Sequence, residues 1–177
     1  MLDMGFIHDV RRIIRELPGR RHSLLFSATM PPDVSKLAQE ILYRPDRVEV
    51  APAASTVDTV DQFAYFVKNS DKTELLRVLL EDDRLSRVLV FARTKHRANR
   101  VAESLSKRGF LADAIHGNKS QTARQRALQR FRSGRSRVLV ATDIAARGLD
   151  VDGITHVINF DIPHEPESYV HRIGRTA

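Results

Sequence analysis

Three side chains that could act on a charged ligand cluster near the carboxyl end of the sequence. His171, Arg172 and Arg175 lie within five residues, and the i, i+3 spacing of the arginines predicts that they share one face of a helix. A guanidinium presents a planar fork of N–H donors, so two of them side by side match a polyphosphate better than a carboxylate. A solvated basic helix end is the ordinary alternative. The other polar residues of the sequence distinguish a polyphosphate site from a solvated helix end.

Polar residues and a glycine also follow a predicted buried strand. Residues 138–140 are apolar, and Thr142 and Asp143 follow them after Ala141. Gly148 and Asp150 follow an Ala-rich turn; the glycine allows close approach of a ligand to the backbone, and the carboxylate can accept a hydrogen bond from a ribose hydroxyl. Because ligands of open α/β sheets collect at the carboxyl ends of strands, we expect this loop to hold one.

Five segments resemble the motifs of DEAD-box RNA helicases, in the order in which that family has them. ATDIAARGLD (141–150) resembles motif V, and YVHRIGRTA (169–177) resembles the beginning of motif VI. LLFSATMP (24–31) resembles motif III, and VLVFARTK (88–95) resembles motif IV. The pair His116-Gly117, followed by Gln121 and Arg124, is similar to the family's HG and QxxR segment. The sequences of these motifs most resemble those of bacterial helicases of the RhlE type.

The resemblance implies roles for individual residues. Arg172 and Arg175 would be arginine fingers on the γ-phosphate of ATP, and His171 would bridge toward a partner domain. Ser27 and Thr29 would link the carboxylates of the ATP site to motif VI, although a helix cap before Pro31 explains them as well. Gly148 and Asp150 would face the nucleotide. The residues implied to contact RNA, mostly through its phosphates, are Thr94, Gly117, Gln121, Arg124, Thr142 and Asp143.

The phosphate-binding loop and the carboxylates of such helicases do not occur in this sequence. Neither a Walker A motif nor a DEAD tetrapeptide is present, and residues 117–120 (GNKS) lack the glycine spacing of a phosphate loop. In the family, the DEAD residues stand just before the segment that MLDMGF resembles. We therefore expect a fragment that does not turn over alone, with ATP and Mg²⁺ bound mainly by the missing half. We predict no metal site within the chain itself.

The positive charge is concentrated in one segment. The chain has a net charge of +7, and residues 93–137 contain thirteen Lys and Arg against Glu103 and Asp113. Such a concentration is typical of a surface that binds a phosphate backbone, and a solvated helix face is the alternative. The chain has no cysteine, which excludes disulfides and thiolate zinc sites, and no apolar run of membrane-spanning length. We expect a cytoplasmic protein that contacts RNA and no membrane.

The pattern of apolar residues predicts an α/β fold with a RecA-like parallel sheet. We predict helices at 6–17, 31–42, 72–81, 96–108, 120–131 and 166–174, and strands at 23–26, 47–50, 62–67, 88–91, 111–115, 138–140 and 156–160. Strands that alternate with helices of this length indicate parallel pairing. Residues 1–50 would be the end of a first RecA-like domain, 51–60 a linker, and 61–177 a second, truncated RecA-like domain.

Three other interpretations remain open. A superfamily-2 DNA helicase would share the architecture, although the FSATMP and TDIAARGLD wording favours RNA. A basic RNA-binding module without catalytic activity describes the isolated fragment well. A metabolic α/β enzyme would need a glycine-rich loop after a strand, and the sequence has none.

Overall fold

In a computed structural model of the chain, residues 6–27, 30, 32–49, 60–146, 148–149 and 151–176 are described. The chain divides into two compact units, Met1–Ala51 and Pro52–Ala177. Nearly all of the predicted linker, residues 51–59, lies outside the described residues. No helix in the described part of the chain is long and apolar enough to cross a membrane.

The first unit contains two helices and little buried surface. Helices α1 (Ile7–Glu16) and α2 (Pro32–Ile41) confirm the two helices predicted there. Arg11 on α1 donates two hydrogen bonds of 2.8 and 2.7 Å to Glu40 on α2, and Leu37 is the one buried apolar residue among the described residues of this unit. The strands predicted at 23–26 and 47–50 are wrong for residues 23–26 and 47–49, which form no strand. A strand needs neighbours for its backbone N–H and C=O groups, and the described part of this unit supplies none.

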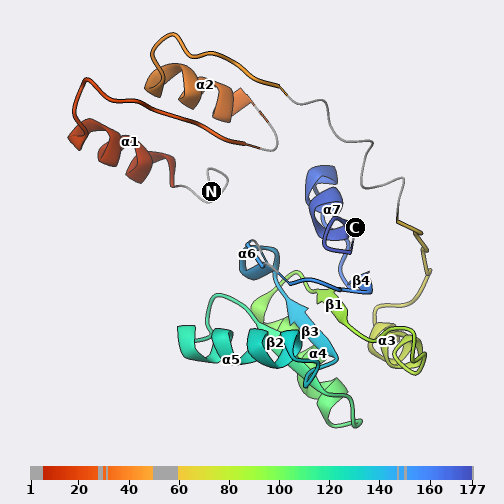
Figure 1. Cartoon of the computed structure of the whole chain (residues 1–177). Coiled ribbons are helices and arrows are strands. Elements are labelled where there is room, and N and C mark those ends of the chain that lie inside the picture. Colours follow the sequence, from red (N-terminus) through yellow and green to blue (C-terminus); the bar gives the residue numbers. More distant parts are fainter. Residues whose placement is uncertain are drawn as a thin grey trace. The chain divides into compact units, whose positions relative to one another are not determined.

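The second unit is a parallel sheet with helices on both faces (Figure 1). Its strand order is β2-β3-β1-β4, and all three pairings are parallel, as predicted. In chain order, the elements are α3 (Lys72–Leu79), β1 (Val88–Phe91), α4 (Lys95–Ser106), β2 (Ala112–Ile115), α5 (Gln121–Arg132), β3 (Val138–Ala141), α6 (Asp143–Ala146), β4 (His156–Asn159) and α7 (Pro166–Ile173). They confirm four of the predicted strands and four of the predicted helices to within a few residues.

Alternation along the strands divides the core into two layers. Val88 and Val90 of β1 pack with Leu76 of α3 and Val101 of α4 on one face of the sheet. Residues Leu89 and Phe91 of β1, by contrast, pack with α5 and α6 on the other face. Strands β1 and β3 are buried along their whole length, which explains why they read as continuous apolar runs.

Two predictions for this unit are wrong. Residues 62–67 form no strand, and the side chains of Phe63 and Phe66 are exposed. Their alternation of apolar residues is compatible with a strand, but no neighbouring strand pairs with them among the described residues. The sequence analysis also missed α6, because a four-residue helix is too short for the 3.6-residue periodicity to become visible.

Candidate functional site

The loops that carry most of the predicted ligand-binding residues lie at one edge of the sheet. The strand register aligns Phe91 with Ala141 and with Asn159, and Ala141 with Ile115, so the four strands end level with one another. Backbone hydrogen bonds continue past the strand ends, from Ala92 N–H to Ala141 O and from Thr142 N–H to Ile115 O. Across this carboxyl edge, the loops therefore follow the order of β2, β3, β1 and β4.

The loop after β1 presents Thr94. This residue is exposed and caps α4, because its hydroxyl oxygen accepts a hydrogen bond of 3.2 Å from Arg97 N–H. Its hydroxyl keeps a proton to donate, and the first N–H groups of a helix lack partners within that helix, so a phosphate oxygen could accept from both.

The loop after β2 is organised by His116. The ring is buried; its Nδ1 accepts a hydrogen bond of 3.3 Å from Asn118 N–H, and its Nε2 lies 2.9 Å from Asn99 Oδ1. Because a backbone N–H only donates, the ring proton is on Nε2 and points to the Asn99 oxygen. Burial, aided by the charges of Lys119, Lys95 and His96, lowers the pKa of His116 below its ordinary value of 6.5. The neutral ring thus holds the turn that exposes Gly117.

Helix α5 begins beside this turn and carries Gln121 and Arg124. Ser120 caps the helix by accepting a hydrogen bond of 3.2 Å from Ala123 N–H. Gln121 is exposed in the first turn, and Arg124 follows at i+3 on the same side of the helix. The Nε of Arg124 is buried and has no hydrogen-bond partner within the described structure. The described structure thus leaves one donor of this guanidinium unsatisfied.

The structure corrects the prediction that Arg172 and Arg175 form a pair on one helical face. Helix α7 ends at Ile173, so Arg175 lies beyond it. Arg172 is only 3% exposed. Its Nε and Nη2 donate bonds of 2.6 and 2.7 Å to the two carboxylate oxygens of Asp143. Its Nη1 donates to Asn159 Oδ1 and to Asp161 O, and its guanidinium lies over the Phe91 ring. A guanidinium with these partners cannot reach a phosphate without breaking them, so the geometry favours a positioning role for Arg172.

The same contacts bear on Thr142 and Asp143. The resemblance implies that Asp143 faces RNA, but both of its carboxylate oxygens accept bonds from Arg172. The side chain of Asp143 remains 41% exposed, and Thr142 is 9% exposed. Thr142 O accepts hydrogen bonds from Ala145 N–H and Ala146 N–H, so the residue directly precedes α6 and satisfies its first N–H groups. The pair therefore orders the loop after β3, and direct contact of either residue with RNA stays a prediction.

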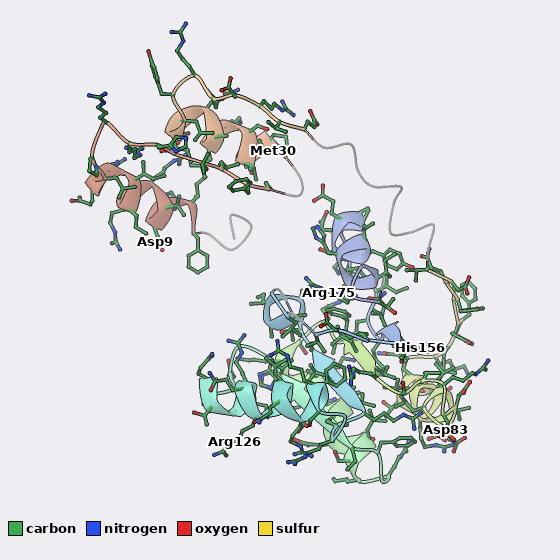
Figure 2. All side chains as sticks on the ribbon, in the orientation of Figure 1. Asp9, Met30, Asp83, Arg126, His156 and Arg175 are labelled. Atoms are coloured by element: carbon green, nitrogen blue, oxygen red, sulfur yellow. The ribbon has the colours of Figure 1, made fainter. Side chains whose placement is uncertain are left out.

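Arg175 and Gly148 are brought together by a single hydrogen bond. Arg175, which is labelled in Figure 2, donates from its Nη1 a bond of 3.1 Å to Leu149 O, the carbonyl next to Gly148. Gly148 is exposed, has a φ of 72° and has no atom within 4 Å of the position that a Cβ would take. Glycine is favoured at such a positive φ. Within the described residues, Arg175 makes no other side-chain hydrogen bond, so its remaining donors are available to a ligand. The predicted ribose contact, Asp150, lies outside the described residues, as does Arg147.

The other predicted residues are distributed as follows. His171 is exposed in the last turn of α7. Ser27 is exposed in the first unit, and Thr29 lies outside the described residues. Because Ser27 and motif VI belong to different units, the link between them stays a prediction. Among the residues that the structure describes, no group of three or more His, Asp or Glu side chains could hold a metal ion.

Sequence reasoning missed Asp161, which ties β4 to the loop that carries Thr94. The Asp161 carboxylate is buried; it accepts a hydrogen bond of 3.0 Å from Arg93 N–H and forms ion pairs with Lys72 and Arg97. A carboxylate directly after an apolar strand was the available signal. Its partners come from α3 and α4, which no sequence spacing could have identified.

The second unit thus has a parallel sheet whose carboxyl edge carries polar loops, the ion pair between buried Arg172 and Asp143, and Arg175, an arrangement that is typical of a helicase carboxyl-terminal domain. The family model for the helicase conserved C-terminal domain matches residues 71–177. The chain belongs to this family, and its relatives are DEAD-box helicases.

Relatives of known name agree with this assignment. The chain is 47% identical over 176 residues to DEAD-box ATP-dependent RNA helicase CshA of Geobacillus kaustophilus. The matched region covers 99% of this chain and 38% of the relative. CshA of Bacillus subtilis is also 47% identical, and there the match covers 36% of the relative. The chain thus spans little more than a third of the length of these relatives.

Solved structures show the same fold. Saccharomyces cerevisiae Dbp5 bound to RNA and ADP BeF3 matches 97% of this chain and 46% of its own, with a TM-score of 0.83 and 30% identity. The Escherichia coli DEAD-box protein SrmB, bound to regulator of ribonuclease activity A, matches 62% of this chain and 65% of its own, with a TM-score of 0.60 and 42% identity. The resemblance to DEAD-box RNA helicases is therefore confirmed; the RhlE subtype stays a prediction.

Proposed function

We propose that this chain is the RNA- and phosphate-facing carboxyl-terminal part of an ATP-dependent RNA helicase that unwinds short RNA duplexes or remodels RNA–protein complexes. The names of the CshA relatives and the RNA and ADP BeF3 bound to Dbp5 support this proposal. The observation that carries it is the bidentate bond between the buried Arg172 and Asp143. That bond connects the segment that carries Arg175 to the loop after β3, at the edge proposed to bind RNA.

RNA would be bound by its phosphates along the carboxyl edge of the sheet. The proposed donors are the hydroxyl of Thr94, the exposed backbone at Gly117, the amide of Gln121 and the guanidinium of Arg124. Thr142 and Asp143 contribute mainly by ordering their loop. The described residues of this edge present no exposed aromatic side chain in these loops for base stacking, so contact would be largely independent of sequence.

The nucleotide-facing residues fit a triphosphate. Arg175 is the proposed arginine finger, because one of its nitrogens is anchored to Leu149 O and the others have no partner among the described residues. Gly148 exposes its backbone next to this guanidinium. ATP, with Mg²⁺, supplies the phosphoanhydride bond that is cleaved. Arg175 stabilises the charge that spreads over the transferred phosphoryl oxygens, and the rest of the ATP pocket comes from outside these residues.

Coupling between the two surfaces would pass through the buried pair. A shift of the segment 172–176 toward a triphosphate moves Arg172, which is bonded to Asp143 after β3 and to Asp161 O after β4. Because both loops lie at the carboxyl edge, the displacement reaches the residues proposed to hold RNA. A cytoplasmic location stays a prediction.

A chimera tests the proposal. This chain replaces the region of Bacillus subtilis CshA that it matches, and RNA-stimulated ATP hydrolysis is measured. The chimera should hydrolyse ATP, and Arg175→Ala should lower the turnover number by about 10³-fold or more while the affinity for nucleotide changes less. Arg126→Ala, an exposed arginine on α5, should keep the parent rate. Equal turnover of the Arg175→Ala chimera and its parent would refute the assignment.

A further inference from the structure

A groove next to the proposed RNA edge has no role in the mechanism above. It has a volume of about 580 Å³ and lies between the beginning of α3 and the length of α4. Thr94 is one of its lining residues. The charged or ionisable residues of its lining are His96, Arg97, Arg100 and Arg108. No aspartate or glutamate belongs to its lining among the described residues.

Helical geometry places the cations in a row. Arg97, Arg100 and Ser104 follow one another at i+3 and i+4, and Arg108 comes one turn later, so all four lie along one side of α4 and its end. At 1.5 Å per residue, the row from Arg97 to Arg108 is about 16 Å long. The groove thus continues from the sheet edge as a cationic track along the helix.

Arg100 is the cation in this track without a partner. Arg97 is paired with Asp161 and Asn69, and Arg108 is paired with Glu74. Arg100, by contrast, is exposed and makes no hydrogen bond or ion pair within the described structure. No described side chain occupies its donors, so its full fork is available to a phosphate.

The opposite wall and the floor complete an anion site. Asn69 and Ser70, just before α3, and Thr73 in its first turn line this wall. Asn69 Oδ1 accepts a bond from Arg97 and the Ser70 hydroxyl donates to Asp71, so the Asn69 amide N–H groups and the Thr73 hydroxyl are the donors that this wall offers an anion among the described residues. The floor is Phe160, which is buried and lies 5.3 Å from the Arg97 guanidinium, so the ring fixes that arginine in place. Hydroxyls and guanidiniums together match phosphate oxygens.

We infer that this groove binds the sugar–phosphate backbone of single-stranded RNA that continues beyond Thr94, an inference that rests on the proposed function. Two observations favour RNA over an acidic protein surface. First, the groove is continuous with the edge that carries Thr94. Second, its apolar residues, Val101 and Phe160, are buried, so it offers no exposed apolar or aromatic anchor of the kind that dominates protein interfaces.

Binding of labelled oligouridylate to the whole chain tests the inference. Oligomers of about 6 and about 16 nucleotides cover the range of single-strand site sizes. Arg100→Ala should weaken binding of the long oligomer and leave the short one unchanged. A single phosphate contact on single-stranded RNA contributes about 0.7 to the salt slope, so the affinity difference between parent and variant should shrink about 2.5-fold between about 50 and about 200 mM salt. Arg100 is exposed and unpaired, so folding is not at risk.

Matched variants separate the possible outcomes. Arg126→Ala removes the same charge from α5, on the other face of the sheet, and should leave the affinity for both oligomers unchanged. If Arg100→Ala binds the long oligomer as the parent does while Arg124→Ala still weakens both, the inference is wrong and the proposed function stands. If the parent binds neither oligomer, both fail. If a polyglutamate peptide displaces the long oligomer from the parent but not from Arg100→Ala at equal charge concentration, the groove is a protein site.

Discussion

Replacement of Asp143 by asparagine probes the Arg172–Asp143 pair at the centre of the proposed coupling. The asparagine keeps one acceptor oxygen but loses the charge, and its NH₂ group faces a guanidinium N–H that can only donate. Arg172 is then left buried with its bonds to Asn159 Oδ1 and Asp161 O and without a counter-charge.

The size of the effect follows from the burial of the two partners. Removal of one member of a fully buried ion pair costs about 3–5 kcal/mol of unfolding free energy. Here the Arg172 side chain is 4% exposed but that of Asp143 is 41% exposed, so solvent screens part of the interaction. We therefore expect a loss of about 2 kcal/mol. With a urea dependence of about 2 kcal/mol per M, the unfolding midpoint should fall by about 1 M.

Urea unfolding followed by far-ultraviolet circular dichroism provides the measurement, since the chain has no tryptophan. Asp83→Asn makes the same chemical change at an exposed residue and should keep the parent midpoint. In an Arg172→Met background, the additional effect of Asp143→Asn should be close to zero, because the pair is already broken. The reasoning fails if Asp143→Asn and Asp83→Asn unfold at the parent midpoint.

Two further predictions concern the loop after β2 and the first unit. Because burial lowers the pKa of His116, the unfolded chain binds a proton more readily than the folded chain, so stability should fall as the pH drops below about 6.5, by at most about 1.4 kcal/mol per pH unit. Urea unfolding midpoints measured at several pH values check this. His116→Gln should make the midpoint depend less on pH, whereas His164→Gln should not change that dependence. An identical pH dependence of the midpoint in the parent and in His116→Gln would contradict the prediction. In limited proteolysis, chymotrypsin should cut at exposed residues outside helices and strands, Leu24, Phe26 and Phe66, and leave a fragment that retains 72–176. The described part of the first unit buries little, so survival of an uncut first unit would contradict this prediction.

The sequence alone determined the class of fold and the edge that carries the site. The helices and strands of the second unit follow from apolar periodicity, and the parallel sheet follows from their alternation. Parallel pairing brings the polar loops after β1, β2 and β3 to one edge, so the order of strands and loops along the chain is enough to group Thr94, Gly117 and Thr142. The motifs also led to the family, because their residue types and order do not depend on coordinates.

Tertiary structure decided what each charged side chain is free to do. Arg172 and Arg175 look equivalent in sequence, but Asp143 stands 29 residues before Arg172 and meets it only because β3 and β4 both lie beside β1. The same strand order places Asp161 against the loop of Thr94 and leaves Arg100 unpaired in its groove. Tertiary structure also decided which predicted strands form. Residues 23–26 and 62–67 have patterns suitable for strands but form none, because a strand exists only where a neighbour completes its hydrogen bonds. Local sequence encodes the propensity of a segment, whereas burial and pairing depend on residues that are distant in the chain.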